Sequence, residues 1–272
     1  MILWGLPKDS KELVGRGLFF LKKNHPKAAV KLFNDALKVD SKNITALYNK
    51  GLALNKMKKY QDAITSLDKV LEINPMHAPS LNIRAIAMAE LGIPEDAIKY
   101  YERAIEADPK YVAAVYNRGV LHDRLGQHED AIQFLDKACK MEPKNTGALF
   151  YKGIVFGKLK KHEEALACFD KVHKLEPKHF DALFHMGIEL AELGKHKDAC
   201  SIFDRILKQR GKNVNVIYAK SRSQAALGNT EESLSLLKHA ISGDKKTIRS
   251  WAKQEKIFDS LKNDKRFRKL VD

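Results

Sequence analysis

The chain has 272 residues, 31% of them charged, and a formal net charge of +15. No run approaches the roughly 18 apolar residues of a membrane-spanning helix, and Met1–Leu6 lacks the basic start of a secretory signal. The three cysteines show neither paired metal spacing nor a disulfide framework. We therefore expect a soluble, cytoplasmic protein that carries no cofactor or metal and binds no membrane.

The first residues stand apart from the rest of the sequence. Met1–Lys8 is an apolar lead that contains Trp4, and the lead as a whole extends over residues 1–9. We expect it to pack over the open end of the first repeat. A strap lying in a binding groove is the alternative.

Residues 10–247 repeat a unit of 34 residues without a gap. The copy at 44–77 is marked by Leu47, Gly51, Ala63, Leu67 and Pro75. The next three copies carry Leu81, Ala85, Ala97, Tyr101 and Pro109, then Val115, Gly119, Ala131, Leu135 and Pro143, then Leu149, Gly153, Ala165, Phe169 and Pro177. A fixed period of this size indicates a solenoid of stacked units.

The pattern predicts two amphipathic helices in each unit. Gly51 lies in the first helix and Ala63 in the second, and these small residues fall where the two helices are expected to cross most closely. Pro75 ends the second helix because it lacks an N–H group. In four copies the turn between the helices carries a glycine suited to a left-handed helix end: Gly92, Gly126, Gly194 and Gly228.

This pattern resembles the tetratricopeptide repeat. The resemblance covers Ser10–Thr247 as seven units, and it implies an all-α fold: a right-handed superhelical solenoid of antiparallel helix pairs, with residues 1–272 as a single domain. The outer units depart most from the pattern, as terminal repeats that face water do. Residues 248–272 lose the period but keep an apolar stripe, so we expect one amphipathic capping helix there.

Two ladders of polar residues follow the repeat period. His128, His162 and His196 share the slot that Tyr60 occupies in the second unit, and we interpret them as structural residues at the interhelix turn rather than metal ligands. In repeats two to five, one basic residue of the first helix is followed by an acid eighteen residues later. These basic residues are Lys50, Arg84, Arg118 and Lys152. We expect cross-helix ion pairs, worth about 0–1 kcal/mol each when exposed.

In the family that the chain resembles, the first helices line a groove that holds an extended peptide or a partner helix. On the groove side of its first helices, this sequence has aromatic residues, apolar residues one helical turn further along, and polar residues beside them. Peptide-binding grooves have a similar composition. The amides of Asn49 and Asn117 can pair with a peptide backbone. Part of the apolar series faces neighbouring helices in the alternative interpretation. The predicted groove residues are Tyr48, Asn49, Leu52, Asn55, Lys56, Tyr116, Asn117, Val120, Asp123, Arg124, Phe150, Ile154, Lys158, Phe184, His185, Ile188 and Tyr218.

The expected partner is a protein or peptide with apolar and acidic residues. The sequence does not match the carboxylate clamp for chaperone C-termini that is known in the family. The first two positions of that clamp need Lys and Asn, but the second repeat has Tyr48 and Leu52 there. A continuous asparagine ladder is interrupted at Ile83. We therefore expect a scaffold that is not a receptor for chaperone tails.

Lysines in some interhelix turns favour a second hypothesis. Lys58, Lys59, Lys160 and Lys161 would bind nucleic acid or an acidic partner, although a solvated lysine-rich surface is the simpler interpretation. No P-loop, dinucleotide fingerprint, nucleophile elbow or HExxH motif occurs in the sequence. We therefore expect no enzymatic activity, and a chain that only docks a separate catalyst is the third possibility.

Overall fold

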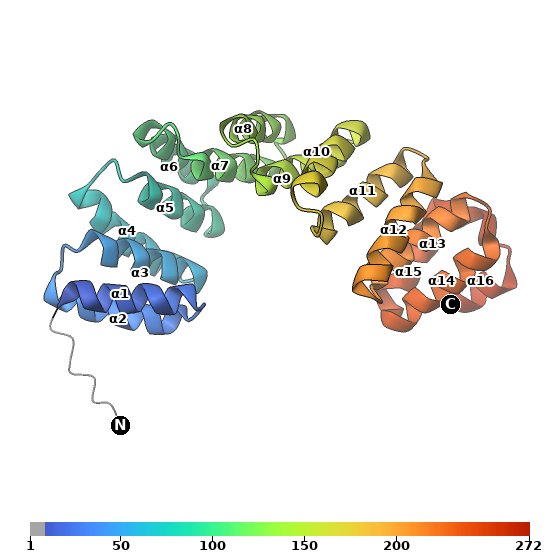
Figure 1. The fold of residues 1–272 in the computed structure, drawn as a ribbon, viewed down its shortest axis with the longest axis horizontal. Coiled ribbons are helices and arrows are strands. Elements are labelled where there is room, and N and C mark those ends of the chain that lie inside the picture. The colour runs from blue at the N-terminus through green and yellow to red at the C-terminus, as the bar shows by residue number, and fades with distance from the viewer. Residues whose placement is uncertain (1–8) are drawn as a thin grey trace, which may run out of the picture. The chain divides into compact units, whose positions relative to one another are not determined.

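The computed structural model of the chain describes residues 9–272, which contain sixteen α-helices, one 3₁₀ helix and no strand. The predicted N-terminal lead falls outside the described residues. The seven predicted helix pairs are α1 (Ser10–Lys22) with α2 (Pro26–Val39), α3 (Ile44–Lys56) with α4 (Tyr60–Ile73), α5 (Ala78–Glu90) with α6 (Pro94–Ala107), α7 (Val112–Arg124) with α8 (His128–Met141), α9 (Thr146–Lys158) with α10 (His162–Leu175), α11 (Phe180–Glu192) with α12 (His196–Arg210) and α13 (Val214–Ala226) with α14 (Thr230–Gly243) (Figure 1).

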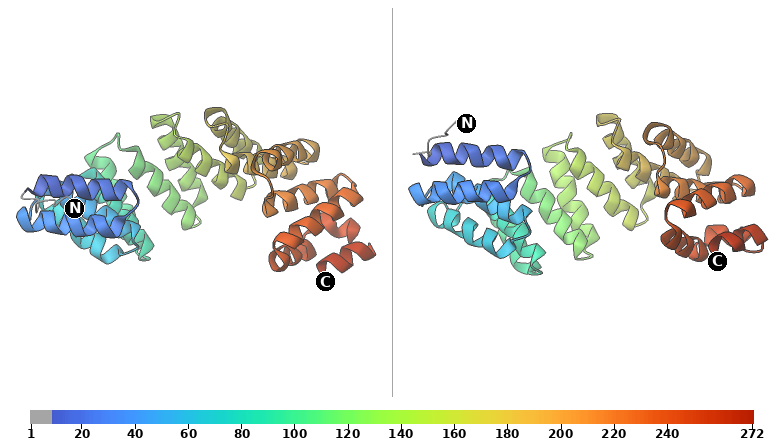
Figure 2. Two further views of the ribbon diagram at one scale, coloured as in Figure 1. Left: turned by 60° about the horizontal axis from the view of Figure 1, so that its bottom comes forward. Right: turned by 90° about the horizontal axis from the view of Figure 1, so that it is seen from below.

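The helices form two compact units, each built from several of the 34-residue repeats, and the two units meet in the sequence at Pro143 and Lys144. From here on, a single helix pair is called a repeat. Unit 1 contains α1 to α8, and unit 2 contains the helices from α9 onward. Within each unit, a first helix packs against its own second helix, and that second helix packs against the next first helix (Figure 2). This stacking confirms an all-α solenoid of paired helices, whereas the single domain over residues 1–272 stays a prediction.

Small residues let the two helices of a pair approach closely. A Cβ atom added at Gly51 would lie 2.8 Å from the side chain of Leu67 and 3.4 Å from the carbonyl oxygen of Ala63. Gly51 therefore has no room for a side chain unless Leu67 moves, and Ala63 is fully buried in the same helix pair. Beside them, every second helix inserts one large side chain that is at most 2% exposed: Phe33, Leu67, Tyr101, Leu135, Phe169, Phe203 and Leu237.

The chain turns sharply between the two helices of each repeat. Gly92, Gly126, Gly194 and Gly228 have φ between 74° and 80°, which confirms the predicted left-handed helix ends. The second helix α4 ends at an extended residue: Asn74, directly before Pro75, has φ −136° and ψ 92°. Asp40 has nearly the same conformation before Ser41, so the proline is compatible with this helix end but is not required for it.

The C-terminal segment differs from the prediction of one capping helix. It consists of α15 (Lys245–Gln254), a 3₁₀ helix (Lys256–Leu261) and α16 (Lys265–Val271). Extended dihedral angles at Glu255 and Asp264 divide it. Its apolar side chains pack with those of α13 and α14 in one buried cluster, which includes Ile248, Ala252, Phe258, Leu261, Phe267 and Val271.

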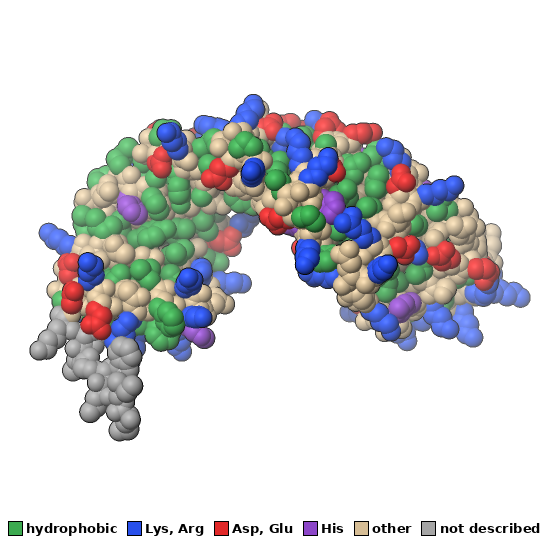
Figure 3. All heavy atoms as spheres, viewed as in Figure 1, with side chains coloured by type: hydrophobic (Ala, Val, Ile, Leu, Met, Phe, Trp, Pro, Cys, Tyr) green, Lys and Arg blue, Asp and Glu red, His purple; other side chains and the backbone are tan. Residues whose placement is uncertain are grey.

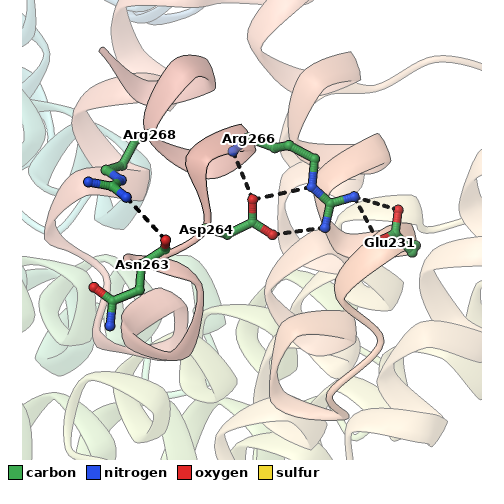
Figure 4. Close-up of polar contacts among 5 residues, drawn as sticks. All are labelled: Glu231, Asn263, Asp264, Arg266 and Arg268. Atoms are coloured by element: carbon green, nitrogen blue, oxygen red, sulfur yellow. Dashed lines mark hydrogen bonds and ion pairs between the residues drawn. The ribbon is translucent and has the colours of Figure 1, made fainter.

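Polar contacts hold the last helix onto α14 (Figure 4). Arg266 donates hydrogen bonds to Glu231 at 2.7 and 2.8 Å and to Asp264 at 2.8 Å. The Asp264 carboxylate also accepts the backbone N–H of Arg266 at 2.7 Å, and these contacts lower the pKa of Asp264 to about 2. Arg268 donates to the carbonyl oxygen of Asn263 at 3.2 Å. We call Glu231, Asp264 and Arg266 the C-terminal clip.

Candidate functional site

The first helices of unit 1 contribute side chains that the packing between helices does not bury. The stacking residues Leu47, Leu81 and Val115 are 3%, 0% and 0% exposed. Other side chains on these helices stay half-buried, and the helices α3, α5 and α7 that carry them are successive neighbours. We call this surface the first-helix face of unit 1, and its residues are Tyr48, Leu52, Ile86, Tyr116 and Val120.

Aromatic rings give this face its rigid part. The rings of Tyr48 and His77 meet edge to face with centroids 5.4 Å apart. Burial raises the pKa of Tyr48 and of Tyr116, so both phenols stay neutral at physiological pH. Hydrophobic side chains also gather at the surface over α3 to α5 (Figure 3). The face is therefore suited to an apolar or aromatic ligand surface.

A polar contact between repeats interrupts the aromatic series. Asn82 occupies the slot that Tyr48 and Tyr116 hold in their own repeats, and its side chain is 2% exposed. The amide of Asn117 donates to Asn82 Oδ1 at 2.9 Å. Tyr111 also forms a side-chain hydrogen bond with Asn82, although burial has the larger effect and raises the pKa of Tyr111. Asn117 therefore joins two repeats instead of presenting a free amide.

Two further predicted groove residues are buried by contacts within their own repeats. Asn49 is 8% exposed, and its amide donates to the carbonyl oxygen of Thr45 at 2.8 Å. Asp123 is 3% exposed and accepts a 2.8 Å contact from Nδ1 of His128. The structure thus places Asn49 and Asp123 inside the helix packing, where they offer almost no surface to a ligand.

The charged ends of these first helices differ from one another. Arg124 forms an ion pair with Glu90 of the preceding first helix, and Tyr60 contacts the same carboxylate at 3.5 Å. Lys56 is exposed, and Asn55 is half-buried with its Oδ1 atom buried and without a hydrogen bond in the described structure. The Arg124 charge is therefore balanced within the protein, whereas Lys56 projects into solvent.

The first helices of unit 2 carry a more aromatic surface. Phe150 lies 5.0 Å from the His179 ring and 5.6 Å from the His185 ring, measured between centroids. His185 also stacks on Phe169 at 5.3 Å and meets Phe184 at 5.7 Å. Burial lowers the pKa of His185, so the ring is held neutral within this aromatic cluster.

The predicted apolar residues of unit 2 lie one turn further along the first helices that carry Phe150 and Phe184. Ile154 and Ile188 are half-buried on α9 and α11, and Lys158 is exposed at the end of α9. We call Phe150, Ile154, Phe184 and Ile188 the first-helix face of unit 2. Each of its two repeats carries one aromatic and one apolar residue, as the second and fourth repeats do in unit 1, whereas Asn82 replaces the aromatic residue in the third.

Tyr218 departs from the predicted groove series. It is 6% exposed, and its ring centroid lies 5.5 Å from that of Trp251 and 6.2 Å from that of Phe258. The C-terminal segment therefore covers Tyr218 and removes it from the candidate face. The repeat slot alone did not reveal this cover, because the segment after residue 247 follows no repeat pattern.

The ion-pair ladder connects different residues from those predicted. Arg84 pairs with Asp68 at 2.6 Å, and Arg118 pairs with Glu102 at 2.7 Å. Each base thus contacts an acid sixteen residues earlier, in the preceding repeat, so the pairing of Arg84 with the acid eighteen residues later was wrong. These pairs tie one repeat to the next.

Acids also accept hydrogen bonds from the histidine ladder, and the repeat pattern alone gives no signal for these contacts. Nδ1 of His162 contacts Glu189 Oε2 at 2.7 Å, and Glu189 is only 5% exposed. Burial raises the pKa of Glu189, and the contact with His162 opposes that effect. The ladder is therefore part of the polar packing at the turns. Within residues 9–272, no three His, Cys, Asp or Glu side chains are placed to hold a metal ion.

Comparison with known protein families places the repeats. Family models described as tetratricopeptide repeat match residues 44–77 and 84–146. A model described as Psidin, N-terminal TPR repeats region, matches residues 121–263, more than half of the chain. No curated protein matches the sequence significantly.

Solved structures agree in fold at low sequence identity. A tetratricopeptide repeat protein from Parabacteroides merdae is 21% identical, with a TM-score of 0.62 over 91% of this chain and 98% of that one. The Pseudomonas aeruginosa protein pilF is 19% identical, with a TM-score of 0.65 over 80% and 96%. A thermophilic protein of Thermus thermophilus is 20% identical, with a TM-score of 0.59 over 67% and 99%.

Proposed function

Because the chain belongs to the tetratricopeptide repeat family, we propose that it is a non-enzymatic scaffold that binds a segment of a partner protein on its first-helix faces. Proteins of this family are generally scaffolds for protein–protein interaction. The observation that carries the proposal is the half-buried row formed by Tyr48, Leu52, Tyr116 and Val120. These side chains are preordered by the helices, yet packing between repeats leaves them partly exposed.

The chemistry of the face defines the partner. Neutral tyrosines and aliphatic side chains provide anchors for apolar residues of a peptide or helix. Lys56 supplies an exposed positive charge at the end of the same helix row. The proposed partner segment therefore combines apolar residues with at least one acid. No helix in the described part of the chain is long and apolar enough to cross a membrane.

The proposal is tested with a double substitution, Tyr116→Ala with Val120→Ala. The partner is first identified by capture with the wild-type chain, and its affinity for purified variants is then measured. We expect affinity to fall at least tenfold, because truncation of hot-spot residues costs about 2 kcal/mol or more. Asn117 is left intact because its hydrogen bond to Asn82 supports the stacking of repeats.

The control is Val39→Ala with Ile73→Ala, two residues that are 56% and 41% exposed on second helices. This variant should bind the partner as the wild type does. Full binding by the Tyr116 and Val120 variant, with unchanged helicity, would exclude the first-helix face of unit 1.

The basic turns give the second candidate surface. Lys58 and Lys59 in unit 1, and Lys160 and Lys161 in unit 2, are all exposed. If they bind the partner, log affinity falls steeply with log salt and the four neutralising substitutions weaken binding. That outcome would favour an acidic partner or nucleic acid over an apolar segment.

A further inference from the structure

A cavity of about 490 Å³ lies in unit 1 between α2, α3 and α4. It is separate from the first-helix face, because the residues that line it include none of the face residues. Lys50, Lys59 and Lys69 line the cavity, and Asp62 is the only acid among its lining residues. None of the three lysines forms an ion pair or side-chain hydrogen bond within the described part of the chain.

Lys50 is exceptional among the basic residues of its repeat slot. Arg84 in the third repeat pairs with Asp68, and Lys220 in the seventh pairs with Asp204 at 2.9 Å. Both acids precede their partners by sixteen residues. The position sixteen residues before Lys50 is Asn34, which is neutral and lines the same cavity.

The missing acid leaves the half-buried ammonium group of Lys50 without an ion pair among residues 9–272. Burial lowers the pKa of Lys50, and the nearby charge of Lys69 acts in the same direction, while Asp62 opposes them. An anion in the cavity would offset the cost of burying the Lys50 charge, and it would reduce the repulsion between Lys50 and Lys69. The site therefore favours a ligand that brings negative charge.

We propose that this cavity binds an organic phosphate, with its phosphoryl group at Lys50 and with the charges of Lys59 and Lys69 in the same lining. Three ammonium groups and one carboxylate leave a net charge of +2 in the lining, which matches the charge of about −1.5 to −2 on a phosphate monoester. Lysine binds phosphate as a point charge. The amide of Asn34 adds a neutral donor beside them.

The remaining walls determine the organic part. Val30 and Leu37 from α2 line the cavity together with Leu47 and Leu54 from α3. Its volume lies within the range of about 300–1,000 Å³ that small-molecule sites occupy. Inorganic phosphate alone would leave these apolar walls uncovered, so a phosphorylated molecule with an apolar portion fits better.

The test is calorimetric titration of the full chain with phenyl phosphate and, separately, with inorganic phosphate. We expect saturable binding of both, with phenyl phosphate several-fold tighter. The decisive variant is Asn34→Asp, which places an acid where repeats two to six have one and should weaken phenyl phosphate binding by about tenfold. Asn34 is exposed, so this variant should keep the wild-type helicity and melting temperature.

Lys50→Met is the second variant, and it should weaken binding to a similar extent. Met186 already occupies this slot in the sixth repeat, so methionine is compatible with the helix packing. The matched control is Lys220→Met, which removes a paired lysine from the same slot in unit 2 and should leave binding unchanged.

Three results would overturn the proposal. The first is the absence of saturable binding with either probe. The second is wild-type affinity in a folded Asn34→Asp variant. The third is equal affinity for phenyl phosphate and inorganic phosphate, which would rule out an organic ligand.

Discussion

One backbone position in each interhelix turn adopts a left-handed conformation. Glycine fills this position in four repeats, but Asn24, Lys58 and Lys160 have φ of 60°, 59° and 57° in the same slot of the other three. A residue with a Cβ atom pays about 1–2 kcal/mol for this conformation. Asparagine tolerates it better than lysine does. The two lysines are therefore the strained members of the series.

Lys160→Gly should raise the free energy of unfolding by about 0.5–1 kcal/mol, because relief of strain exceeds the added flexibility of the unfolded chain. Urea denaturation followed by circular dichroism measures the change. Asn24→Gly should have a smaller effect, and Gly126→Ala should destabilise the protein because Gly126 has φ 77°. A loss of stability in Lys160→Gly would contradict the strain argument.

We expect the stability of unit 2 to depend on pH because the ring of His185 is held in a partly buried aromatic cluster. Burial lowers the folded-state pKa of His185 below the ordinary histidine value of about 6.5, so the unfolded state binds a proton more readily. The resulting stability is present above pH 6.5 and is lost as the pH falls through the folded-state pKa. Urea midpoints measured above and below pH 6.5 should show this decrease.

His185→Phe removes the titrating group while keeping an aromatic ring in the cluster. The decrease in stability at acid pH should become smaller in this variant. Burial also lowers the pKa of His77 and His173, so a residual pH dependence is expected. Substitution of the exposed His239 serves as the control, and an equal effect there would contradict the assignment to His185.

At the scale of the element, the helices were predictable from the sequence, whereas the partners of their side chains were not. The period fixed the seven helix pairs, the close approach at Gly51 and the helix end before Pro75. It could not fix the direction of the ion pairs. An acid eighteen residues after one base is also sixteen residues before the next, since the period is 34, and Arg84 takes the earlier acid, Asp68. Only the packing of successive repeats decides between them.

The C-terminal segment depends on one fully buried ring. Phe258 is 0% exposed and lies 5.6 Å from the ring of Phe267 and 6.2 Å from that of Tyr218. Phe258→Ala should destabilise unit 2 by about 3–5 kcal/mol because it leaves a cavity. Urea denaturation, followed by near-ultraviolet circular dichroism, measures this loss.

Leu175→Ala is the control for this prediction, because Leu175 is 40% exposed on α10 of the same unit. A surface change of this kind should stay within about 0.5 kcal/mol. If Phe258→Ala were no more destabilising than the control, the C-terminal segment would not contribute to the stability of unit 2.

At the scale of the whole molecule, repetition predicts which helices carry half-buried side chains better than it predicts the exposure of each residue. The slots of Tyr48, Tyr116 and Phe150 are half-buried on first helices as the repeat implies. Tyr218 shares that slot and Asn49 occupies the next one, but both are buried, Asn49 with a hydrogen bond to its own helix and Tyr218 under the C-terminal segment. Each of these contacts occurs in one repeat, so a pattern shared by all repeats does not predict them.

The C-terminal clip has a consequence for assembly between molecules. A stack of similar repeats has no inherent length limit, because each open apolar face is complementary to another repeat and can start a filament. Here α15 and α16 already occupy the apolar surface of α13 and α14, and Arg266 fastens α16 through Glu231. A second copy of the chain could reach this surface only if the C-terminal segment were displaced. We therefore expect the covered face to disfavour end-to-end addition of further copies.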